Sequence, residues 1–235
     1  MLVTDARKFW IGLIGLVTFF VVLAVWVSPV INGKTGLEWA DDLFNQLAKN
    51  SAYYIPEQAE KAAEFEGTPV DATVKARSPG EAEKIARLAA SAGAETTVDG
   101  QKVKIKGDLG RLSEAALADA DALHHGQEQA FLSKYGMSGR EVVYYWWTAF
   151  KGINKQYLKE DKGPEANYTK SIITKGLEPA YNFAGFQAAK FSERAGVASF
   201  LLVFYLIYTI WYGFSIWYLF EGLGVVARAG EKKEA

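Results

Sequence analysis

The sequence contains no cysteine and only two histidines among its 235 residues. The absence of cysteine excludes disulfide bonds, thiolate metal sites, cysteine-ligated iron–sulfur clusters, covalent c-type haem and a cysteine nucleophile. The two histidines, His124 and His125, lie outside both long apolar runs, which excludes the bis-histidine haem of a cytochrome b type span. Any soluble domain in this chain must therefore be held together by packing and hydrogen bonds alone.

Net charge and catalytic motifs are also missing. The formal net charge of the chain is −1, and residues 32–196 carry 21 Lys+Arg against 23 Asp+Glu. So balanced a segment lacks the basic surface that nucleic-acid binding requires, and we expect no nucleic-acid partner. The sequence has no nucleophile elbow, no phosphate-binding glycine loop and no HExxH motif, so we expect neither enzymatic activity nor a resident cofactor.

Apolar residues are abundant and concentrated at the two ends. Residues 9–31 and 197–220 are uncharged, and each run is long enough to cross a hydrocarbon core of about 30 Å. The second run continues to 226 if it is shifted past Glu221. The first run exceeds the roughly 7–15 apolar residues of a signal peptide, so we expect a retained anchor.

Basic residues flank both runs on their outer sides: Arg7, Lys8, Arg228, Lys232 and Lys233. The positive-inside rule then makes residues 1–8 and 227–235 cytoplasmic tails and residues 32–196 an extracytoplasmic domain. The predicted fold class is a mainly α membrane protein with two transmembrane helices, located in a bacterial inner membrane. Residues 68–125 have the signals of a β-α-β-β-α segment, and the rest of the domain, including about 178–195, reads mostly as helix.

The second apolar run carries hydroxyl groups in mid-membrane. At 100° per residue, five of them fall within about 120° of one another, with Gly213 beside them. They are Tyr205, Tyr208, Thr209, Tyr212 and Ser215. The face predicts contact with another protein helix, in a second subunit or a second copy, and Gly12 and Gly15 offer a close-packing surface on the first run. Two alternatives stay open: Thr209 and Ser215 bond to their own backbone, or the face holds a quinone or lipid head group.

Two groups of titratable residues are further candidates. Glu221 is interfacial if the second span ends at residue 220, and an intramembrane acid if the span extends to 226. Asp121, His125 and Glu128 share one helix face and could supply metal ligands. A solvated helix end is the default explanation of these three residues, and the metal site is only a weak candidate.

The run Tyr144, Tyr145, Trp146 and Trp147 has three interpretations: domain core, a seat on the membrane surface, or a docking face. The layout of span, exported domain and span resembles the input half of chemoreceptors and sensor kinases, without an output module after the second span. We therefore expect a non-catalytic accessory or assembly subunit of a larger membrane complex, such as a respiratory or transport complex. The alternatives are a ligand-binding or sensing module that signals through a partner, and a self-associating membrane scaffold.

Overall fold

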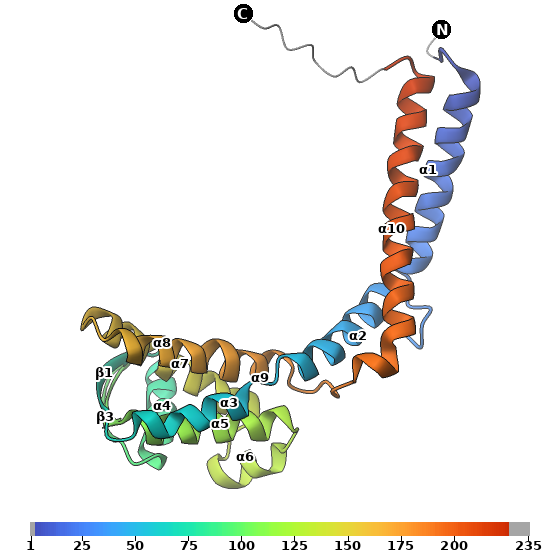
Figure 1. Cartoon of the computed structure of the whole chain (residues 1–235). Helices are drawn as coiled ribbons and strands as arrows, with labels where there is room; N and C mark the ends of the chain where they lie inside the picture. Colours follow the sequence, from blue (N-terminus) through green and yellow to red (C-terminus); the bar gives the residue numbers. More distant parts are fainter. Residues whose placement is uncertain (1–2, 226–235) are drawn as a thin grey trace, which may run out of the picture. The chain divides into compact units, whose positions relative to one another are not determined.

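The computed structural model describes residues 3–225, and the chain in this range is mostly helical (Figure 1). It divides into two compact units. Within the described range, residues 3–45 and 189–225 form the first, which we call the terminal unit, and residues 46–188 form the second, the central unit. At this level the fold class expected from the sequence is confirmed, with two long apolar helices, a helical majority and one small sheet.

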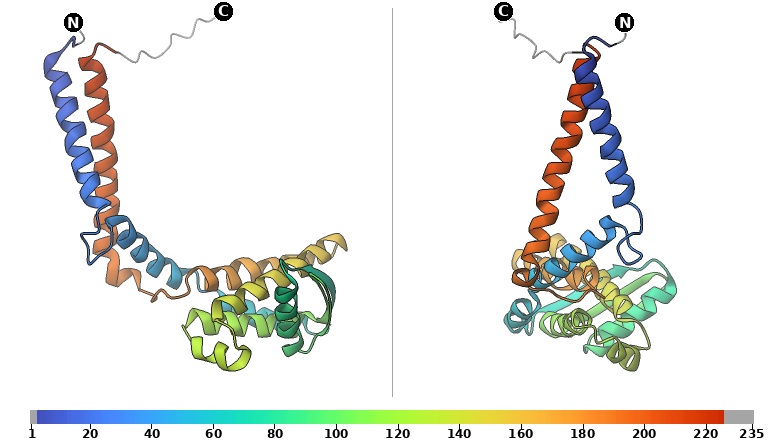
Figure 2. Two further views of the ribbon diagram at one scale, coloured as in Figure 1. Left: turned by 180° about the vertical axis from the view of Figure 1, so that it is seen from behind. Right: turned by 90° about the vertical axis from the view of Figure 1, so that its right-hand side faces the viewer.

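The terminal unit is built on α1 (Ala6–Trp26) and α10 (Phe191–Gly222), which lie side by side (Figure 2). The Asp5 side chain caps α1 by accepting a hydrogen bond from the Lys8 amide at 3.1 Å. Both helices are long and apolar enough to cross a membrane, and only 11% of the most apolar stretch of each is buried. Their apolar side chains therefore mostly face outward from the pair.

The central unit contains the predicted β-α-β-β-α segment, in the expected order. Its elements are β1 (Pro69–Lys75), α4 (Pro79–Ser91), β2 (Glu95–Asp99), β3 (Lys102–Asp108) and α5 (Leu109–His124). The sheet is antiparallel with strand order β1-β3-β2, and its register places Val74 opposite Val103. Alternate side chains of β1 and β3 are buried, as the period-2 pattern requires.

Helices make up the rest of the central unit, which also receives the C-terminal part of α2 (Gly36–Ser51). They are α3 (Ile55–Glu60), the 3₁₀ turn η1 (Lys61–Phe65), α6 (Glu128–Tyr135), α7 (Gly139–Lys159), α8 (Gly163–Ser171), the π-helical η2 (Ile172–Leu177) and α9 (Glu178–Asn182). Helices α4 and α7 pack on the sheet, and α5 packs on α7. The largest fully buried side chains of this core include Trp146, Phe131, Phe150, Ile105, Leu117 and Ile153.

A glycine fixes the position of α7 against the sheet. A Cβ atom on Gly152 would lie 2.7 Å from Cγ2 of Val74 and 3.2 Å from its Cα, so only glycine allows this approach. One turn and a half later, the Tyr157 hydroxyl donates a hydrogen bond to the Pro69 carbonyl at 3.1 Å. These two contacts hold α7 along β1.

The prediction of one continuous helix over about 178–195 is wrong. Helix α9 ends at Asn182, and α10 begins only at Phe191. Between them Gly185 has a φ of +88°, which side-chain-bearing residues rarely adopt and which interrupts a helix.

Candidate functional site

The contact between α1 and α10, which we call the seam, depends on glycine. A Cβ atom on Gly12 would lie 2.4 Å from the backbone nitrogen of Leu219, and one on Gly222 would lie 2.4 Å from that of Phe9. Because the opposing atoms are backbone, no rotamer change could relieve either clash. Small residues of this kind let two helix backbones approach closely, as in packed membrane helices.

Three of the five predicted hydroxyl residues contact α1. Tyr208 stacks on Phe19 with ring centroids 4.2 Å apart, and Tyr212 contacts the same ring at 4.8 Å. Ser215 lies against Gly15 and donates its own hydroxyl to the Trp211 carbonyl at 2.8 Å. The Tyr208 hydroxyl is buried and has no hydrogen-bond partner among residues 3–225.

The other two hydroxyl residues, Tyr205 and Thr209, face outward, and Tyr212 is partly exposed beside its contact with Phe19. Tyr205 is 69% exposed and Tyr212 is 41% exposed, whereas Thr209 donates to the Tyr205 carbonyl at 2.8 Å. Gly213 has open space where a Cβ would lie. Tyr205, Thr209 and Tyr212 follow one another at four- and three-residue spacing on one helix face, and we call them the outer stripe.

Polar contacts also join the two helices. The Trp211 indole nitrogen donates to the Gly15 carbonyl at 3.0 Å. At the opposite end from α2, Lys8 Nζ lies 2.8 Å from Glu221 Oε2, and the Glu221 side chain is 21% exposed. Glu221 therefore has a counter-ion within its own chain.

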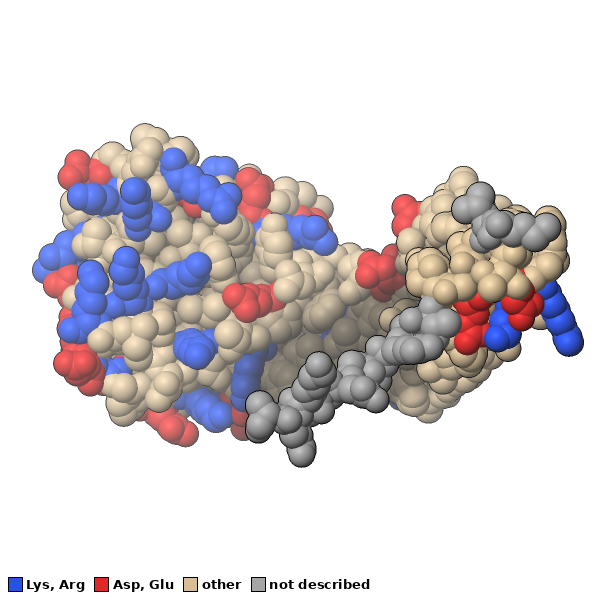
Figure 3. Space-filling model, turned by 90° about the horizontal axis from the view of Figure 1, so that it is seen from above, with Lys and Arg blue, Asp and Glu red and all other residues tan. Residues whose placement is uncertain are grey.

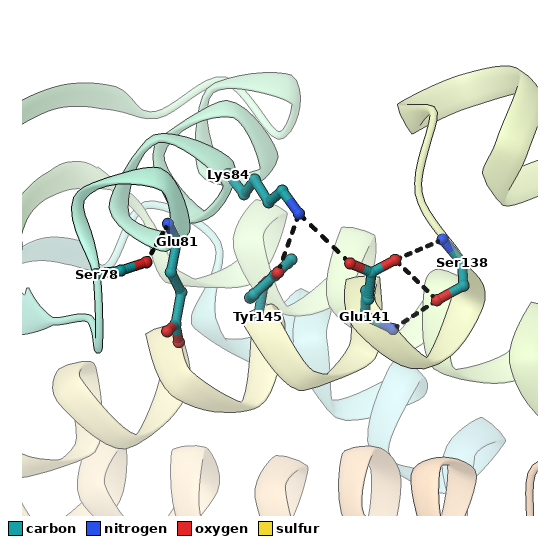
Figure 4. Close-up of polar contacts among 6 residues, drawn as sticks. All are labelled: Ser78, Glu81, Lys84, Ser138, Glu141 and Tyr145. Carbon is teal, nitrogen blue, oxygen red and sulfur yellow. Dashed lines mark hydrogen bonds and ion pairs between the residues drawn. The ribbon is translucent and has the colours of Figure 1, made fainter.

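Two of the four predicted docking aromatics belong to the core of the central unit. The buried Trp146 donates its indole N–H to Asp119 at 2.7 Å, and Tyr135 donates its hydroxyl to the same carboxylate at 2.8 Å. Tyr145 is also buried. Lys84 reaches its hydroxyl at 3.3 Å and Glu141 at 3.4 Å, which links α4 to α7 (Figure 4).

The other two aromatics, Tyr144 and Trp147, reach the surface. The guanidinium carbon of Arg77 lies 4.9 Å from the Tyr144 ring centroid, and Lys151 Nζ lies 4.2 Å from the Trp147 ring. Tyr144 and Trp147, together with Arg77, Glu178 and Tyr181, line a pocket of about 290 Å³, which we call the aromatic groove. On the face of the central unit shown in Figure 3, Lys and Arg side chains are interspersed with Asp and Glu. Each cation of the two pairs is attracted to the ring face that it covers.

The candidate metal ligands do not converge. His125 Nδ1 lies 3.4 Å from Asp121, but Glu128 accepts a hydrogen bond from the Gly139 amide at 2.8 Å. Among residues 3–225 the structure brings together no group of three His, Asp or Glu side chains that could hold a metal ion.

His124, which follows Asp121 by three positions, is buried instead. Its ring stacks on Tyr53 at 4.4 Å, and Tyr53 donates its hydroxyl to Asp121 at 2.5 Å. Burial lowers the pKa of His124 to about 4, with nearby Lys49 adding to the effect, so the imidazole is neutral at pH 7.

Several residues at these sites carry no recognisable sequence signal. Arg77 and Tyr181 reach the aromatic groove from the end of β1 and from α9, and only tertiary packing brings them beside Tyr144. Phe19 is one of many large apolar residues in the first run, so its role as the platform for Tyr208 and Tyr212 is visible only in the structure.

Comparison of the chain with protein-family models, with curated proteins and with solved structures gave no match.

Proposed function

We propose that this chain is a non-catalytic accessory or assembly subunit of a larger membrane complex. In this proposal α1 and α10 form a two-helix anchor, and the central unit lies on the extracytoplasmic side. Support comes from the length and apolar character of both helices and from their outward-facing side chains. Basic residues in both tails of the sequence, such as Arg7 and Lys232, favour this orientation.

The outer stripe is the observation that carries the proposal. Within residues 3–225, the hydrogen bonds made by α10 side chains between residues 197 and 220 come from Thr209, Trp211 and Ser215. The hydroxyls of Tyr205 and Tyr212 thus project from mid-helix without a partner. Each hydroxyl left unbonded in hydrocarbon costs on the order of 1–3 kcal/mol.

A transmembrane helix of another subunit is the occupant that removes this cost. Such a helix would supply hydrogen-bond acceptors to Tyr205 and Tyr212, and it could approach closely where Gly213 leaves space. Interhelical hydrogen bonds in membranes are worth about 0.6–2 kcal/mol each. Two such bonds add specificity to an interface whose remaining contacts are apolar.

The aromatic groove supplies a second contact outside the membrane. Trp, Tyr and Arg are the residue types that dominate the binding energy of protein interfaces. Trp147 is already positioned, because its indole N–H donates to Glu178 at 3.0 Å. Arg77 is the one cation and Glu178 the one acid among the residues that line the groove, and Lys151 lies over the Trp147 ring. An acidic segment of a partner would complement Arg77 and Lys151.

Photo-crosslinking from α10 tests the proposal. A benzophenone side chain at position 205 or 212 should crosslink to one other membrane protein, whereas positions 207 and 214 serve as controls. Ile207 and Phe214 are also exposed and seven residues apart, but they lie on a different side of α10.

Mutation of the outer stripe should then release that partner. Tyr205→Leu/Tyr212→Leu is expected to reduce co-purification in mild detergent at least tenfold, while Ile207→Leu/Phe214→Leu retains the complex. Equal crosslinking from all four positions, or recovery of this chain alone as a monomer or homo-oligomer, would contradict an accessory role.

A further inference from the structure

Lys49 is a buried cation with too few acceptors. It lies in the last turn of α2 and is only 5% exposed. Its ammonium group makes one hydrogen bond within residues 3–225, to the Phe186 carbonyl at 2.6 Å, although it has three N–H donors. No carboxylate of the described residues lies within ion-pair distance of it. A buried charge without a partner is costly, and proteins usually avoid it.

The same lysine opens onto a pocket of the central unit. The pocket measures about 530 Å³, within the usual range for small-ligand sites. Its lining contains no acidic residue: Lys49, Asn50, Tyr53, His124, His125, Gly126, Gly185, Phe186, Gln187 and Ala188. The walls therefore combine one cation, two imidazoles, two aromatic rings and several neutral donors.

We infer that this pocket binds a small anionic ligand through its carboxylate or phosphate oxygens, with Lys49 as the counter-ion. The inference goes beyond the proposed docking role, because every residue of the pocket belongs to the central unit.

The chemistry of the lining supports an oxyanion over other ligands. A carboxylate or phosphate accepts several hydrogen bonds and so satisfies the remaining Lys49 donors. His124 is held in place by its stack on Tyr53, and a neutral imidazole donates from one ring nitrogen without adding a second buried charge. A cationic ligand would be repelled by Lys49, and a purely apolar ligand would leave the ammonium unpaired.

The charged groups around the pocket agree with this assignment. Burial lowers the pKa of Lys49, which means that its charged form lacks stabilising partners. Asp121, on α5, accepts the Tyr53 hydroxyl and lies beside His125. Asp121 therefore does not serve as the counter-ion of Lys49, and an anion bound in the pocket would take that role.

The experiment uses the full chain in mild detergent and follows thermal unfolding by tryptophan fluorescence. Inorganic phosphate, acetate and benzoate are titrated against chloride at constant ionic strength. One of these oxyanions should raise the Tm saturably, by roughly 5–10 °C at about 100 times its Kd. Phosphate and the two carboxylates form separate arms, so the responding arm identifies the oxyanion.

Lys49→Met should remove the response, whereas Lys170→Met, at an exposed lysine, should retain it. A second readout needs no variant. In the chain of unaltered sequence, the rate at which Lys49 is acetylated, measured by mass spectrometry, should fall as the anion binds, with half of the decrease at the anion concentration that gives half of the Tm shift. The inference is overturned if no oxyanion shifts the Tm saturably, if Lys49→Met responds as the parent does, or if the anion leaves the acetylation rate of Lys49 unchanged.

Discussion

Alanine at Gly12 should open the seam between α1 and α10. Its Cβ would lie 2.4 Å from the Leu219 nitrogen and 2.8 Å from both the Leu219 Cα and the Ser215 carbonyl oxygen. Ordinary contact begins at 3.4 Å, so the helices must separate locally by about 1 Å. A gap of that size forfeits up to half of each dispersion contact nearby, and overpacking typically costs about 1–3 kcal/mol.

The same substitution at Gly213 provides the control. Gly213 lies on α10, and a Cβ there meets no atom within 4 Å. Gly213→Ala is expected to be neutral or to stabilise the helix by up to about 1 kcal/mol, because alanine has the higher helix propensity. The two variants thus share their chemistry and differ in their surroundings.

Disulfide trapping measures the effect cleanly because the sequence has no native cysteine. A Cβ on Gly15 would lie 3.2 Å from that of Ser215, slightly closer than the roughly 3.5–4.5 Å of natural disulfides, so the helices of Gly15→Cys/Ser215→Cys must move apart by only a few tenths of an ångström for the bond to form. Adding Gly12→Ala should slow the reaction at least tenfold, and adding Gly213→Ala should leave the rate unchanged. Equal rates in all three chains would refute the assigned role of Gly12.

Two further predictions concern the central unit. Asp119→Ala leaves the buried donors of Trp146 and Tyr135 unpaired and should lower the free energy of unfolding by about 3 kcal/mol, whereas the exposed Asp99→Ala should change it by less than about 0.5 kcal/mol in denaturant titrations. The pKa of His124 is about 6.5 in the unfolded chain and about 4 in the folded chain, so above pH 6.5 the neutral imidazole makes its full contribution to the free energy of unfolding. This contribution, at most about 3 kcal/mol, is lost as the pH falls toward 4. Plots of Tm against pH should be flatter for His124→Phe than for the parent, and parallel plots would contradict this assignment.

Local patterns in the sequence were sufficient to predict most elements of the fold. The β-α-β-β-α order follows from the alternation in β1, the Ser78 cap of α4 and the turn at Gly100, and each of these signals acts within a few residues. The helix predicted over 178–195 failed because nothing in its local composition shows that Gly185 takes a positive φ.

The candidate sites depend on contacts that sequence patterns do not encode. Helical periodicity placed Tyr205, Tyr208 and Tyr212 on one face, but the rotation of α10 against α1 decides which of them Phe19 covers. Similarly, Lys49 is an ordinary lysine in the last turn of a helix until Phe186, distant in sequence, folds over it.

The sequence separation across the seam has a consequence for the order of folding. The Trp211 to Gly15 hydrogen bond joins residues 196 positions apart, and the whole central unit is encoded between them. At about 5–20 residues per second, roughly 10–40 s of synthesis separate α1 from its mate. During that time the glycine surface of α1 is open to other helices, while the central unit can already form its own contacts. Correct pairing therefore depends on what shields α1 during translation as well as on the stability of the finished pair.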